Sequence, residues 1–150
     1  MATIGLMPPK GNPADFETAT LTVATAKYGS LVIRDTGDNE HDTVKCTTAA
    51  GEQVTGVVQS QGDPNNSGLF ATGSQVSVAK GGTCEVLFAA SEALVKGAKV
   101  IASGTAGLAK ILGAEADPYW ILGECAETRT IGASPGLGSV DIKIQWVAKD

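Results

Sequence analysis

The chain has 150 residues, of which 43% are hydrophobic and only 5% aromatic, and its formal net charge at pH 7 is −5. This length is enough for one domain with a hydrophobic core of its own. The acidic balance and the scattered lysines and arginines argue against a phosphate backbone as partner. No apolar run approaches the roughly 20 residues that span a bilayer. We therefore expect neither nucleic acid nor a membrane as a partner.

Residues 1–19 differ in composition from the rest of the chain. Pro8, Pro9 and Pro13 disfavour both a regular helix and a central strand. The apolar side chains in this segment are those of Ile4, Leu6, Met7 and Phe16. Two interpretations are open: a frayed terminus, or an extended arm that lies on another chain. We treat residues 1–19 as an N-terminal arm and residues 20–150 as a β-rich domain.

From residue 20 onward, short segments rich in Val, Ile and Thr alternate with Gly-rich turns, which is typical of strands. The clearest example runs from Val140 to Val147, where apolar and polar residues alternate at almost every step. The predicted strands cover residues 21–26, 30–36, 44–48, 54–60, 75–80, 83–89, 99–103, 108–112, 120–127 and 139–147. This spacing predicts an all-β fold with the form of a small barrel or sandwich.

Two local patterns refine the predicted fold. Gly81 and Gly82 separate two alternating segments, so we expect a tight hairpin turn there. A short helix is predicted over residues 91–96, because Ser91 suits its N-cap and Gly97 suits its C-terminal end. The side chains expected to face the core on the two sides of the hairpin are those of Val76, Val78, Cys84, Val86 and Phe88.

Two sequence features suggest chemistry, and each has a simpler structural explanation. Residues 132–136 fit the Gly-x-Ser-x-Gly elbow of serine hydrolases, but Pro135 lacks the backbone N–H that this elbow uses as an oxyanion donor. An acidic cluster could hold a calcium ion, although its spacing differs from the EF-hand pattern and its glycine is typical of a turn. The members of this cluster are Asp35, Asp38, Glu40, His41 and Asp42.

The remaining reactive side chains predict no catalytic site. Cys46, Cys84 and Cys125 are odd in number and widely spaced, which fits neither a disulfide framework nor a zinc site. The single histidine, His41, leaves no plausible catalytic triad. Residues 61–68 read as an exposed polar loop. We expect no cofactor and no metal, and we expect the protein not to be an enzyme.

Several segments follow one another in a recognisable order. They are residues 54–59 (VTGVVQ), 76–82 (VSVAKGG), 89–100 (AASEALVKGAKV), 121–127 (ILGECAE) and 139–144 (SVDIKI). Together they resemble the capsid decoration proteins, also called cement or head-stabilising proteins, of tailed bacteriophages. The resemblance covers about residues 20 to 147 and rests on patterns of small and apolar residues. The chain departs from the family pattern at Ala98, where an acidic residue is common.

The resemblance implies a β-rich protein on the outside of a phage head, made in the host cytoplasm and located on the virion. It implies a homotrimer at threefold or quasi-threefold positions that bridges neighbouring major capsid protein subunits. It also implies that the arm contacts the capsid, and the arm residues in question are Ile4, Leu6, Met7, Pro8, Pro9 and Phe16. The alternatives are a particle-displayed receptor- or glycan-binding module, a hydrolase or lyase on a β scaffold, and a subunit of the phage tail.

Overall fold

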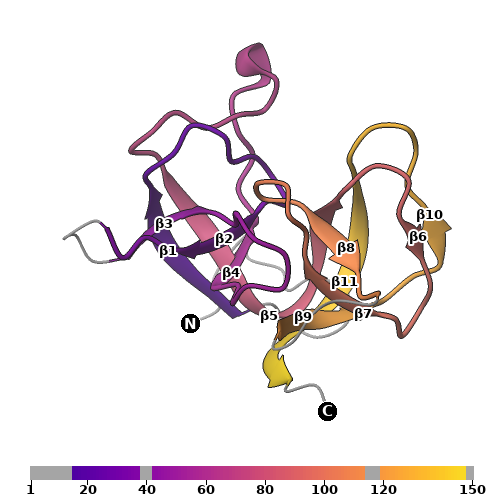
Figure 1. Cartoon of the computed structure of the whole chain (residues 1–150). Helices are drawn as coiled ribbons and strands as arrows, with labels where there is room; N and C mark the ends of the chain where they lie inside the picture. Colours follow the sequence, from indigo (N-terminus) through magenta and orange to yellow (C-terminus); the bar gives the residue numbers. More distant parts are fainter. Residues whose placement is uncertain (1–14, 38–41, 114–118, 148–150) are drawn as a thin grey trace, which may run out of the picture.

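The computed structural model describes residues 15–37, 42–113 and 119–147, which form a nearly all-β fold (Figure 1). The strands are β1 (Asp15–Leu21), β2 (Leu31–Arg34), β3 (Thr43–Cys46), β4 (Gly56–Val58), β5 (Gln75–Phe88), β6 (Ala93–Leu94), β7 (Lys99–Ala102), β8 (Ala109–Ile111), β9 (Tyr119–Cys125), β10 (Arg129–Thr130) and β11 (Gly136–Val147). Within the described ranges the only helical segment is the 3-10 turn η1 (Pro64–Asn66). The prediction of an all-β fold is confirmed, and of its two predicted forms, barrel and sandwich, the structure has the barrel.

The long strand β5 belongs to two closed rings of strands. In the first ring the order is β1-β3-β2-β4-β5, and β1 closes it by pairing antiparallel with β5. In the second ring the order is β5-β11-β9-β7-β8, closed by a parallel pairing between Phe88 and Ala109. Figure 1 shows the two rings as lobes on either side of β5. We call them the first lobe (β1–β4 with residues 75–81) and the second lobe (residues 82–88 with β7, β8, β9 and β11).

Each lobe has a hydrophobic core, and the strands between the lobes contribute to both. Val32 of β2 and Val58 of β4 belong to the core of the first lobe. Leu31 and Val57, their neighbours in sequence, belong to the core of the second lobe. Successive side chains of a strand point to opposite faces, so β2 and β4 are buried on both sides. The lobes are therefore joined through an apolar, two-sided sheet.

The predicted hairpin at Gly81 and Gly82 is wrong, because β5 continues through both glycines. The pair instead marks the point where β5 changes partners. β1 pairs with β5 from Gln75 to Gly81, and β11 pairs with it from Gly82 to Phe88. Gly82 has a φ of 82°, a conformation that strains any residue with a Cβ. The side chains expected to face the core are nevertheless all buried: Val76, Val78, Cys84, Val86 and Phe88.

The predicted helix over residues 91–96 is also wrong. Its central residues form β6, which pairs with β10 in a separate two-stranded sheet. Ser91 has a φ of 65°, and its N–H donates to the carbonyl oxygen of Gly132 at 2.8 Å. A helix of six residues is too short to be stable by itself, whereas the strand buries Leu94 in the core of the second lobe. Burial of one large side chain decides the local structure.

The boundary of the N-terminal arm requires correction. β1 begins at Asp15, so residues 15–19 belong to the first lobe rather than to an arm. The reason is burial of Ala19 and Leu21 in the core of that lobe, supported by an ion pair at 2.9 Å between Glu17 and Lys80. Residues 1–14, which include the predicted contacts Ile4, Leu6, Met7, Pro8 and Pro9, lie outside the described residues.

Candidate functional site

In the acidic cluster, the carboxylate of Asp35 has hydrogen-bond and ion-pair partners within the protein. The Asp35 carboxylate accepts hydrogen bonds from Thr22 Oγ1 at 2.6 Å and from the Gly37 N–H at 3.1 Å. The Thr22 hydrogen bond is the main cause that lowers the pKa of Asp35, and the ammonium of Lys45 adds to it. Asp38, Glu40 and His41 lie outside the described residues. Among the described residues, no group of three potential ligand side chains is placed to hold a metal ion.

The serine of the Gly-x-Ser-x-Gly match lies in the loop between β10 and β11. Ser134 is exposed, and the chain enters strand β11 two residues later. The strand-to-helix turn that positions the nucleophile of a hydrolase elbow is therefore missing at this loop. The motif is therefore explained as a Gly- and Pro-containing loop that precedes the last strand.

The three cysteines are free and buried. Burial raises the pKa of the Cys84 thiol to about 11, and it also raises the pKa values of Cys46 and Cys125. A thiol reacts as its thiolate, so buried and protonated cysteines behave as small apolar side chains.

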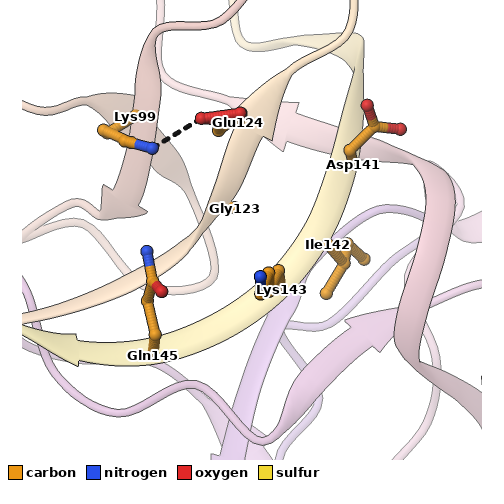
Figure 2. A pocket seen from close by; sticks show the side chains of 7 residues that line it. All are labelled: Lys99, Gly123, Glu124, Asp141, Ile142, Lys143 and Gln145. Carbon is orange, nitrogen blue, oxygen red and sulfur yellow. Dashed lines mark hydrogen bonds and ion pairs between the residues drawn. The ribbon is translucent and has the colours of Figure 1, made fainter.

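A hollow of about 470 Å³ lies on the second lobe beside β9 and β11, whose pairing shifts register between Ile142 and Gln145 (Figure 2). Lys99 Nζ is 2.5 Å from Glu124 Oε2, and Asp141 accepts a hydrogen bond from Thr83 at 2.5 Å. The carboxylates in this hollow thus already have partners. Its lining residues include no serine, threonine, cysteine or histidine, and the Lys99 ammonium is engaged in the ion pair with Glu124.

Two exposed aromatic side chains mark one end of the molecule. Phe16 on β1 is 50% exposed, and Trp146 on β11 is 51% exposed. The rings of Trp120 and Trp146 pack edge to face, with centroids 5.2 Å apart. Because β1 starts opposite Gly81 and β11 leaves β5 at Gly82, both strands part from β5 at one place. Figure 1 shows the start of β1 and the end of β11 on the same side of the molecule. We call Phe16, Trp120 and Trp146 the aromatic end.

The aromatic end contains the one predicted contact residue that the structure describes, Phe16. The alternation of residues 140–147 does not show whether the Trp146 side chain lies in the core or on the surface. The alternation of β11 places Val140, Ile142 and Ile144 in or against the core of the second lobe, but Trp146 continues beyond it. The residue at which an alternating strand extends beyond the core depends on the lengths of the neighbouring strands. The sequence of the strand itself does not contain that information.

No protein family matches the chain, and no curated protein matches it. Among the described residues, no helix combines the length and apolar character needed to cross a membrane.

Proposed function

We propose that this protein decorates the outer surface of an expanded phage capsid, where it has a structural rather than a catalytic role. It binds as a homotrimer at threefold or quasi-threefold sites and bridges neighbouring major capsid protein subunits. The order of segments that resembles capsid decoration proteins supports this proposal. The observation that carries it is the aromatic end, where two large aromatic side chains are half exposed on a closed β scaffold.

The aromatic end suits adhesion to a large protein partner. Exposed aromatic side chains are typical anchors of protein interfaces. Covering the exposed half of one such ring contributes about 1 kcal/mol, since complete burial is worth about 1.5–3 kcal/mol. Contacts this weak become durable when three copies bind together, because each bound copy raises the local concentration of the others. A closed trimer also matches the local symmetry of a threefold site.

The closed strand pairing of the two lobes suits a protein that must not assemble into fibres. The two closed rings pair most strand edges of both lobes. Unpaired edges are templates for association with further chains, so closure limits such contacts. This leaves the aromatic end as the proposed contact with the capsid.

The double variant Phe16→Ser with Trp146→Ser tests the aromatic end. We expect it to bind emptied, expanded heads at least tenfold more weakly than the unmodified protein in co-sedimentation, because the apolar anchors of all three copies are lost. Val95→Ser is the matched control, since Val95 is 56% exposed but lies in the turn after β6. Its binding should be unchanged.

Two outcomes would contradict the proposal. One is a complete lack of binding between the unmodified protein and heads of its own phage. The other is a double variant that binds as tightly as the unmodified protein and raises the disruption temperature of the heads equally. Immunogold labelling of virions separates a head protein from a tail subunit.

A further inference from the structure

A second hollow, of about 340 Å³, lies on the seam between the two lobes. Its volume is within the range of pockets that hold small ligands. The first lobe and its loops contribute Lys27, Tyr28 and Gln61, and the second lobe contributes Glu85, Leu87 and Leu137. We call this hollow the seam groove. It is separate from the aromatic end, because Leu137 is at the start of β11 and Trp146 near its finish.

Backbone hydrogen bonds to both lobes hold the wall of the seam groove in place. The Gly29 N–H donates to the carbonyl oxygen of Val58, and the Gly29 carbonyl oxygen accepts from the Leu87 N–H, both at 2.8 Å. Gly29 has a φ of 85°, and a Cβ there would lie 2.7 Å from Leu137 Cδ2. The turn that carries Tyr28 therefore packs directly on the floor of the groove. A wall fixed in this way loses little entropy when a ligand binds.

The polar groups of the seam groove are partly committed and partly available. Tyr28 Oη donates to Glu85 Oε1 at 3.2 Å, and Gln59 Nε2 donates to the Glu85 carbonyl oxygen at 2.9 Å. Burial, aided by the neighbouring Glu85 carboxylate, raises the pKa of Tyr28 to about 12, so the phenol keeps its proton. Among the described residues, the side chains of Lys27 and Gln61 have no hydrogen-bond or ion-pair partner.

The floor of the seam groove is apolar. Leu87 is 6% exposed, and Leu137 is partly buried beside it in the paired strand. A ligand that fits this groove must place an apolar face on the leucines. It must also offer donors to Glu85 and acceptors to Lys27, while Gln61 can supply either partner.

We infer that the seam groove binds a saccharide. A sugar ring has C–H faces that cover aliphatic and aromatic side chains, and its hydroxyl groups both donate and accept hydrogen bonds. An anionic ligand would be repelled by the Glu85 carboxylate. A bound hydrocarbon would cover the polar side chains of the rim without giving them hydrogen-bond partners. A neutral polyhydroxylated ring satisfies the floor and the rim together. This inference does not depend on the proposed capsid function.

Saturation-transfer NMR on the full chain, with a panel of neutral mono- and disaccharides, tests the inference. We expect saturation transfer to the C–H protons of at least one saccharide. Glu85→Gln should weaken its binding at least tenfold, since a carboxylate accepts stronger hydrogen bonds than an amide. Lys27→Met, which keeps an aliphatic chain and removes the ammonium, should weaken it as well. Glu124→Gln is the matched control, because it makes the same change in the other hollow, and it should bind like the unmodified protein.

Three results would overturn the inference. The first is no saturation transfer to any saccharide at millimolar concentration. The second is saccharide binding that is unchanged in both Glu85→Gln and Lys27→Met. The third is that the unmodified protein binds extended peptides on a peptide array and the two variants lose this peptide binding, while no saccharide distinguishes them from the unmodified protein. Circular dichroism of each variant establishes that it is folded. Head binding by Glu85→Gln should equal that of the unmodified protein, which separates this test from that of the proposed function.

Discussion

At the scale of single residues, Gly138 shows how closely the second lobe is packed. A Cβ added to it would overlap Leu94 Cδ1 of β6 and lie 3.1 Å from Phe88 Cε2 of β5. Leu94 and Phe88 are both fully buried, so neither can move into solvent. The absence of a side chain at residue 138 lets β6 lie across β11.

Gly138→Ala is therefore expected to destabilise the protein by about 1–3 kcal/mol, the usual cost of overpacking a core. Gly132→Ala is the control, because no atom lies within 4 Å of a Cβ at that exposed glycine. Its effect should stay within about 0.5 kcal/mol. Urea denaturation of both variants measures the difference, and equal midpoints would show that β6 does not pack on β11 in this way.

At the scale of elements, β5 decides the architecture because it serves two sets of partners. Its first half pairs with β1 and β4, and its second half pairs with β11 and β8. Gly81 and Gly82 allow the strand to change direction between the lobes without ending. The positive φ of Gly82 is the local feature that permits this change.

Gly82→Ala is expected to cost about 1–2 kcal/mol of unfolding free energy, because a left-handed conformation is unfavourable for a residue with a Cβ. Gly104→Ala serves as the comparison, since a Cβ there meets no atom within 4 Å and its φ is not positive. Thermal unfolding followed by circular dichroism compares the two variants. A Gly82→Ala protein as stable as Gly104→Ala would mean that β5 is not bent at this point.

At the scale of the whole molecule, the N-terminal arm is distinguished from the first lobe by where β1 begins. Deleting residues 1–14 leaves all of β1 in place, so the protein should keep its thermal stability. If the arm contacts the capsid, the same deletion should weaken binding to expanded heads at least tenfold. Deleting residues 1–18 provides the contrast: it removes most of the pairing between β1 and β5 and should destabilise the first lobe.

Co-sedimentation with heads and thermal unfolding measure the two effects separately. A protein lacking residues 1–14 that binds heads as tightly as the full chain would rule out a role of the arm in capsid binding. A protein lacking residues 1–18 that is as stable as the full chain would show that β1 is dispensable to the first lobe.

Much of the fold was predictable because strand signals are local. Alternation of apolar and polar residues depends only on the period of a strand, so the core-facing residues of β5 and the alternation of β11 were predicted correctly. The same local signals failed at Gly81 and Gly82 and at residues 91–96. Two glycines are compatible with a turn or with a bent strand, and Ser91 with Gly97 is compatible with a helix or with two turns.

The candidate surfaces were less predictable from the sequence than the fold, because tertiary structure brings their residues together. Tyr28, Glu85 and Leu137 come from three distant segments, and no pattern in the sequence links them. Likewise, the exposure of Trp146 follows from where the core of the second lobe ends. The sequence by itself determined the class of the fold and the core-facing positions of β5, Cys84 among them, because these depend on composition and short-range periodicity. Only the tertiary structure decided that one strand would be shared by two lobes and which side chains would meet on their seam, because long-range strand pairing is selected by the burial of both cores together.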